Sequence, residues 1–162
     1  MRLLTFTVIA FYSFGAAAVE GTVTAVGDGD TFALGGTTVH VFGIDAPEFA
    51  QQCRADAIHA PGPSPCVPCG QRARDVLAGL VLGKTVTCTD RGECTAGKTL
   101  VGPFMLTQGQ AVADRAVLDV KDKALYIGAE ASGKRANAGI WAQTFIPPQA
   151  WRERKQRLEC ER

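Results

Sequence analysis

The sequence has almost no net charge. Its 17 lysine and arginine side chains stand against 16 aspartate and glutamate side chains, which gives a formal net charge of +1 at pH 7. Proteins that bind long nucleic acids usually gain affinity by neutralising phosphates with an excess of basic side chains. The balance excludes a binding mode that depends on the charge of the whole protein. Any binding to a polyanion must depend on a local patch.

The sequence also has no apolar run long enough to span a bilayer comfortably. The apolar stretch from Leu3 to Phe14 follows Arg2 and precedes three small residues, Ala16-Ala17-Ala18. This order is typical of a signal peptide. We therefore expect residues 1–18 to be a signal peptide and the protein to be exported, to the periplasm or the medium, without membrane contact after cleavage. The alternative is a retained membrane anchor.

The chain is long and apolar enough for one folded domain, since 46% of its 162 residues are hydrophobic. Alternation and β-prone runs predict strands, and a 3.6-residue period predicts helices. The predicted strands are 20–26, 31–34, 39–43, 84–89 and 100–104, and the predicted helices are 70–82, ended by Gly83, and 124–137. The proline-rich segment 49–69 is expected to be a rigid loop, and 119–122 a charged loop.

Three carboxylates flank the predicted hairpin of strands 31–34 and 39–43. Asp30 stands just before its first strand, Asp45 just after its second, and Glu48 follows Pro47 in the next turn. Folding the hairpin brings Asp30 alongside Asp45, and two hard oxygen ligands at one sheet end suit Ca²⁺ or Mg²⁺. Glu48 is then a candidate general base beside a metal-bound phosphate. The alternative is that these residues only form turns, which aspartate, glycine and proline favour for backbone reasons.

The two turns together closely resemble the motif of the staphylococcal nuclease (thermonuclease) family. Asp28-Gly29-Asp30-Thr31 and Gly43-Ile44-Asp45-Ala46-Pro47-Glu48 match it residue by residue, and the resemblance spans roughly Val19 to Trp151. It implies an α+β, mainly β domain over residues 19–151, a single OB-fold five-stranded barrel with about three helices. Residues 152–162 then form a basic C-terminal tail, which is either a modest binding patch or a solvated, frayed helix.

The resemblance also implies a function and a set of site residues. Asp30, Asp45 and the carbonyl of Ala46 would hold Ca²⁺, with Asp28 in the outer shell. Glu48 would activate water against a phosphodiester of DNA or RNA, and the protein would act as a monomer.

The sequence departs from the family where active members carry two arginines for the scissile phosphate. The first position holds His40, and the nearest match to the second is Lys98. Histidine is largely neutral at pH 7 and lysine is a point charge, whereas a guanidinium offers paired donors. We therefore expect weakened phosphodiesterase activity, unless Arg91 or Arg54 compensates. The alternative is a non-catalytic module that binds nucleic acid or another ligand.

Six cysteines in an exported chain favour structural disulfides. The spacing predicts Cys88–Cys94 across a hairpin and Cys53–Cys69 within the proline-rich segment, which leaves Cys66–Cys160. The alternative is that Cys66 and Cys69, which two residues separate in a Cys-x-x-Cys pair, belong to a zinc or redox site.

Overall fold

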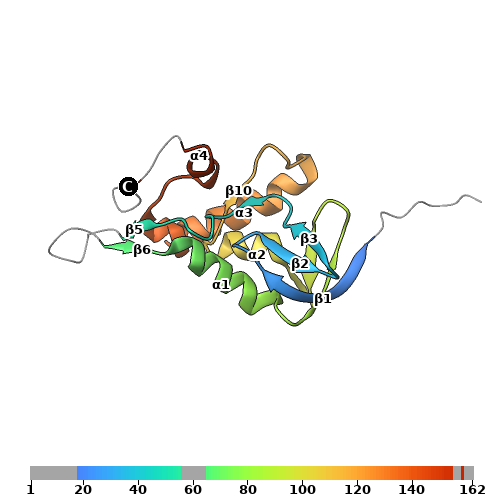
Figure 1. The fold of residues 1–162 in the computed structure, drawn as a ribbon. Coiled ribbons are helices and arrows are strands. Elements are labelled where there is room, and N and C mark those ends of the chain that lie inside the picture. The colour runs from blue at the N-terminus through green and yellow to red at the C-terminus, as the bar shows by residue number, and fades with distance from the viewer. Residues whose placement is uncertain (1–17, 56–64, 155–157, 159–162) are drawn as a thin grey trace, which may run out of the picture.

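The computed structural model describes residues 18–55, 65–154 and 158, so residues 1–17 of the predicted signal peptide and Cys160 lie outside the described residues. Figure 1 shows a mixed α+β arrangement in which the sheets are antiparallel. The α+β part of the predicted fold class is confirmed. No helix in the described part of the chain is long and apolar enough to cross a membrane.

The strands form three sheets among the described residues, with six, two and three strands. The six-stranded sheet has the order β3-β2-β1-β7-β8-β9, from Thr37–His40, Thr31–Leu34, Val19–Val26, Thr85–Cys88, Cys94–Ala96 and Thr99–Leu100. The second pairs β10 (Val112–Ala113) with β4 (Ile44–Asp45), and the third has the order β11-β5-β6, from Gln143–Thr144, Cys53–Ala55 and Cys66–Val67.

Four α-helices and one 3₁₀-helix accompany the sheets within the described residues. They are α1 (Cys69–Val81), α2 (Val101–Thr107), α3 (Val120–Arg135), η2 (Gly139–Ala142) and α4 (Pro148–Arg152). The resemblance implied about three helices, and the additional one is the short α4, whose first residue is Pro148, a position where the fixed φ of proline suits a helix start.

The large sheet curls so that its edge strand approaches a distant turn. The pairing of β1 with β2 is irregular between Val23 and Ala25, and such bulges increase strand twist. Beyond β3, the Phe42 N–H donates to the carbonyl of Gly92 in the turn between β7 and β8, at 2.9 Å. The strand pairings among the described residues do not form a closed ring. The OB-fold barrel is therefore not confirmed.

Two local predictions are wrong. The predicted strand 100–104 is instead the end of β9 followed by α2, because Pro103 falls in the first turn of that helix, where no backbone donor is required. The predicted charged loop 119–122 is the start of α3. Asp119 caps it by accepting from the N–H groups of Lys121 and Asp122.

The segment 49–69 is also more than a loop. It contributes β5 and β6, which pair with each other, and β5 pairs with β11 near the other end of the sequence. In Figure 1, β5 and β6 lie at the opposite end of the molecule from β1 to β3. The prolines flank β6, at the sheet edge, where a missing N–H is tolerated.

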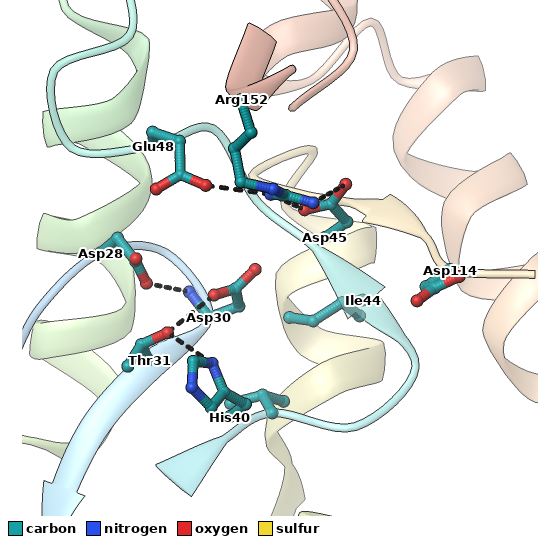
Figure 2. Close-up of a pocket in the computed structure, with 10 residues that line it drawn as sticks. Asp28, Asp30, Thr31, His40, Ile44, Asp45, Glu48, Asp114 and Arg152 are labelled. Carbon is teal, nitrogen blue, oxygen red and sulfur yellow. Dashed lines mark hydrogen bonds and ion pairs between the residues drawn. The ribbon is translucent and has the colours of Figure 1, made fainter. Parts of the chain in front are cut away.

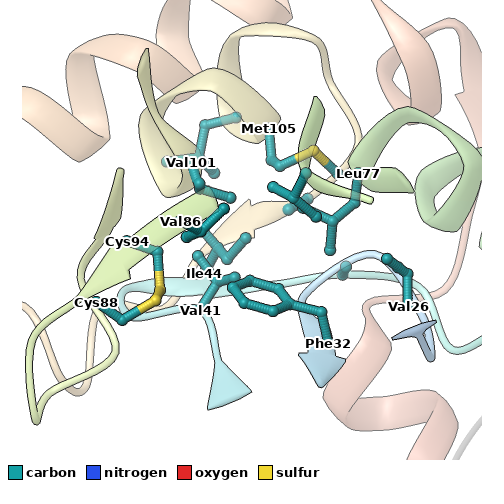
Figure 3. Packing of buried hydrophobic residues seen from close by; sticks show 14 of the residues in the cluster. Val26, Phe32, Val41, Ile44, Leu77, Val86, Cys88, Cys94, Val101 and Met105 are labelled. Carbon is teal, nitrogen blue, oxygen red and sulfur yellow. A yellow bond between two sulfur atoms is a disulfide. The ribbon is translucent and has the colours of Figure 1, made fainter. Parts of the chain in front are cut away.

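The main core fills the space between the curled sheet, α1 and α2. Figure 3 shows Phe32, Ile44 and Val86 packed against Leu77 of α1 and Met105 of α2. Ile44 belongs to β4, so the strand that carries Asp45 is anchored in this core on its buried side. That anchoring leaves the alternate residue, Asp45, directed away from the core.

A buried carboxylate fixes β10, the partner of β4. Glu130 of α3 accepts from the Ala113 N–H at 3.0 Å and pairs with Arg115 at 2.7 Å and Lys134 at 2.9 Å. Its side chain is only 3% exposed. Because charged groups are rarely buried without partners, this network locks α3 onto β10 and, through it, onto β4.

Two predicted disulfides are confirmed, Cys53–Cys69 and Cys88–Cys94. Cys66 is disulfide-bonded as well. Its predicted partner, Cys160, lies outside the described residues, so that pairing stays a prediction. No described cysteine is free, which contradicts a thiolate zinc site at Cys66 and Cys69.

Candidate functional site

Both halves of the family-like motif line one open cavity of about 300 Å³. Figure 2 shows it between the turn before β2, the strand β4 and the helix α4. Half of its ten lining residues are acidic; the residues are Asp28, Asp30, Thr31, His40, Val41, Ile44, Asp45, Glu48, Asp114 and Arg152. The structure thus brings together all the predicted site side chains except Lys98.

The turn that carries Asp28 and Asp30 is held against β4 by a close approach. Asp30 accepts from the Ala46 N–H at 2.8 Å, and its own N–H donates to Asp28 Oδ1 at 3.1 Å. A Cβ at Gly29 would collide with the Cβ atoms of Ala46 and Ala73. Only glycine therefore lets this turn reach the start of the second motif.

Asp30 is an unusual carboxyl group. Burial raises its pKa from 3.8 to about 7, the hydrogen bond from the Ala46 N–H opposes this rise, and the nearby charge of Asp28 adds to it. Burial and a like charge both disfavour the ionised form. A cation in the cavity would relieve this destabilisation.

His40 joins the carboxylates through Thr31. The Thr31 hydroxyl donates to Asp30 Oδ1 at 3.0 Å, and it lies 3.1 Å from His40 Nδ1. A hydroxyl has one proton to donate, so in this arrangement His40 Nδ1 carries the hydrogen and donates to Thr31. Thr31 therefore links His40 to Asp30, one of the predicted metal ligands. The Nε2 atom of His40 is left for another partner.

Glu48 is positioned by a residue that sequence reasoning missed, the fully buried Gln51. Gln51 Oε1 accepts from the Glu48 N–H at 3.3 Å, and Gln51 Nε2 donates to the carbonyl of Ile146 at 2.7 Å. The Ile146 segment leads directly into α4. Gln51 thus links the turn of the candidate base to the segment that carries Arg152.

The start of α1 packs against the same turn. The Gly70 N–H donates to the carbonyl of Gln51 at 3.1 Å. A Cβ at Gly70 would overlap the carbonyl oxygen of Glu48. The absence of a side chain at Gly70 is what allows α1 and the Glu48 turn to come this close.

Arg152 is the second site residue that sequence reasoning missed. Its Nη1 lies 2.6 Å from Asp45 Oδ1 and 2.9 Å from Glu48 Oε1, and its Nη2 lies 3.2 Å from Asp45 Oδ2. The hydrogen bond to Asp45 is the largest effect that raises the pKa of Arg152 above its usual value. The only sequence signal was the basic character of the tail, which does not indicate this contact.

The other candidate cations lie elsewhere. Lys98 lies in the turn between β8 and β9 and lines a separate groove with Phe104 and Leu125. Arg91 pairs with Glu93 and Asp122 and stacks on Phe42. Neither Arg91 nor Arg54 lines the carboxylate cavity.

The donor chemistry of the cavity fits a hard cation such as Ca²⁺, because Asp28, Asp30 and Asp45 offer carboxylate oxygens. Within the described residues, no three His, Cys, Asp or Glu side chains converge as a metal cluster. Figure 2 shows the guanidinium of Arg152 between Asp45 and Glu48. A metal ion at Asp45 would have to replace that two-point contact.

No protein-family model matches this chain, and no curated protein matches it. The turn motifs and the geometry of this cavity therefore carry what can be inferred about function.

Proposed function

We propose that the protein is a Ca²⁺-dependent phosphodiesterase that cleaves DNA or RNA, in a domain similar to that of staphylococcal nuclease. The observation that carries the proposal is that Asp30, Asp45 and Glu48, from two turns that resemble the family motif, line the same cavity. A carboxylate set that can hold a metal ion, with a separate candidate base, suits metal-assisted hydrolysis of a phosphodiester.

In this proposal Asp30, Asp45 and the carbonyl of Ala46 hold the ion, and Asp28 supports Asp30 from outside. The ion, when bound, supplies positive charge that polarises a phosphate oxygen. Glu48 accepts the proton of a water molecule while the water oxygen attacks phosphorus. The P–O bond to the leaving sugar oxygen breaks, and that oxygen takes a proton from solvent.

The curled sheet supports an OB-type barrel for this domain, since the Phe42–Gly92 hydrogen bond joins the end of β3 to the β7–β8 turn. The disulfides support export, because such bonds persist in oxidising compartments. We propose a monomer in the periplasm or the medium.

The test is hydrolysis of single-stranded DNA and of RNA with and without Ca²⁺, using the protein that begins at residue 19. We expect cleavage that requires Ca²⁺ and that falls at least 100-fold in Glu48→Gln, which keeps the size of the side chain but cannot accept a proton. Cleavage by Glu48→Gln at the wild-type rate would assign the activity to a contaminant or to another site.

A non-catalytic binding module is the second candidate. The contact of Arg152 with Glu48, at 2.9 Å, favours it, because a carboxylate engaged by a guanidinium is a poorer base. Binding of oligonucleotides without any cleavage in Ca²⁺ would support this function over hydrolysis.

A further inference from the structure

The carboxylate cavity contains one arginine and no lysine among its described lining residues. Arg152 stands there beside five carboxylates, those of Asp28, Asp30, Asp45, Glu48 and Asp114. A phosphate diester is an anion, so these carboxylates repel it. Any phosphate that enters must therefore meet positive charge within the cavity.

Arg152 is held where it can supply that charge. Its contacts with Asp45 and Glu48 fix the guanidinium at the two side chains assigned to the ion and to the base. The side chain is 45% exposed, so a ligand can reach it from solvent. A guanidinium has five N–H donors in a planar fork, which suits it to hold a carboxylate and a phosphate oxygen at once.

Arg91 and Lys98, two of the other cations considered for the phosphate, do not line this cavity. Arg91 already faces Glu93, Asp119 and Asp122. Lys98 lies in the groove beside α2 and α3. Among the described lysines and arginines, Arg152 of the C-terminal helix α4 is therefore the one that lines the cavity.

We propose that Arg152 binds the phosphate of the substrate in this cavity, although neither motif turn contains it. This inference rests on the proposed function, because it assumes a nucleic-acid phosphodiester as the ligand. It assigns to α4 a substrate-binding role and makes the segment after Pro147 part of the site. The alternative is that Arg152 only neutralises Asp45 and Glu48. Its removal would then leave phosphate binding unchanged or stronger.

The experiment uses a fluorescein-labelled single-stranded DNA oligonucleotide and the Glu48→Gln protein in Ca²⁺, so that bound DNA is not cut. Binding is measured by anisotropy for this protein and for versions that also carry Arg152→Gln, Arg152→Lys or Arg154→Gln. Arg154 is a matched control, because it belongs to the same tail but does not line the cavity. A melting curve of each variant checks that it is folded.

We expect Arg152→Gln to weaken DNA binding roughly 10- to 100-fold, the effect typical of one charge-assisted contact. Arg152→Lys should recover part of the affinity, because lysine keeps the charge but not the fork. Arg154→Gln should change affinity by less than about threefold, through the general charge of the tail. Equal or tighter binding by folded Arg152→Gln, equal losses in Arg152→Gln and Arg154→Gln, or no binding by any protein would overturn the proposal.

The outcome also separates this inference from the proposed function. If the wild type cleaves DNA and Arg152→Gln cleaves and binds it equally well, the inference fails and the proposed function stands. If DNA binding depends on Arg152 but the wild type cleaves neither DNA nor RNA, the inference stands and the proposed hydrolysis fails.

Discussion

Arg152 and Asp45 form a two-point ion pair across 107 positions of sequence, with Nη1–Oδ1 and Nη2–Oδ2 distances of 2.6 and 3.2 Å. Both oxygens of a candidate metal ligand are thus engaged by a side chain of the same chain. The pair is partly exposed, with 45% of the Arg152 side chain and 16% of the Asp45 side chain accessible. A metal ion and the guanidinium therefore compete for Asp45.

This competition predicts that Arg152→Gln tightens Ca²⁺ binding. A partly exposed ion pair contributes up to about 1 kcal/mol, so removing the competing cation should lower the Kd about fivefold. Asp45→Asn should abolish most of the binding heat, because it removes a charged ligand. Isothermal titration of the three proteins, with Arg154→Gln as the control, measures this. Identical heats from wild type and Asp45→Asn would eliminate the ion site.

Gly70→Ala tests the close approach of α1 to the Glu48 turn. The added methyl group would overlap the Glu48 carbonyl, so the turn must move. We expect stability to fall by about 1–3 kcal/mol and hydrolysis to fall at least tenfold. Gly79→Ala on the same helix is the matched control. Nothing lies within 4 Å of its new Cβ, and stability should rise by about 0.5–1 kcal/mol. Urea unfolding and hydrolysis rates that are the same for both variants would refute this packing argument.

Gln51→Leu keeps a similar volume but removes both polar contacts. The Glu48 N–H and the Ile146 carbonyl, both partly buried, would each lose a partner, at a cost of about 1 kcal/mol each. We expect a lower melting temperature and weaker DNA binding, since the turn of Glu48 and the segment before α4 lose their link. Thermal melting and anisotropy measure the two effects. A melting temperature for Gln51→Leu equal to that of the wild type would show that Gln51 does not hold these segments together.

Glu130 predicts a pH dependence of stability. Burial alone would raise its pKa, but the hydrogen bonds from Arg115, the Ala113 N–H and Lys134 together lower it below 4.5. A carboxyl with a lowered folded-state pKa stabilises the protein above its unfolded-state pKa, and this stabilisation is lost as pH falls through the folded-state value.

Glu130→Gln should therefore cost about 2–4 kcal/mol at pH 7, because Arg115 and Lys134 lose their buried anion. The difference from the wild type should shrink as pH falls below about 4.5. Urea unfolding at a series of pH values tests both points. A difference that stays constant from pH 7 to pH 3 would show that the charge of Glu130 is not what stabilises the network.

His40 and Lys98 should respond differently to replacement by arginine. His40 lines the carboxylate cavity, so His40→Arg adds a fixed charge near the phosphate and should raise hydrolysis at least tenfold. Lys98 lines the groove beside α2, so Lys98→Arg should leave the rate within about twofold. Hydrolysis rates of both variants test this. The double variant His40→Arg, Glu48→Gln gives the rate that does not depend on Glu48. A larger gain from Lys98→Arg would contradict the location of the phosphate site.

The local order of the chain was readable from the sequence because short-range physics determines it. The helix predicted over 70–82 is α1, Cys69–Val81. The hairpin predicted from strands 31–34 and 39–43 forms as the β2–β3 pair, but β3 is Thr37–His40, because the turn consists of Gly35 and Gly36 alone and Thr37 already pairs with Leu34. The pairing of Cys53 with Cys69 and of Cys88 with Cys94 also followed from spacing. The strand predicted at 100–104 failed because a short apolar run suits a strand or a helix alike, and packing of α2 against α3 determines the result.

The sequence by itself therefore indicated four of the five carboxylates of the cavity, since one hairpin and the turns beside it carry Asp28, Asp30, Asp45 and Glu48. The fifth, Asp114, was added only by the fold. Only the tertiary structure decided which cation faces them. Arg152 reaches Glu48 across 104 positions, and Gln51 reaches Ile146 across 95. No periodicity or turn signal encodes such contacts, because they depend on how the β5–β11 pairing and the Gln51–Ile146 hydrogen bond place α4.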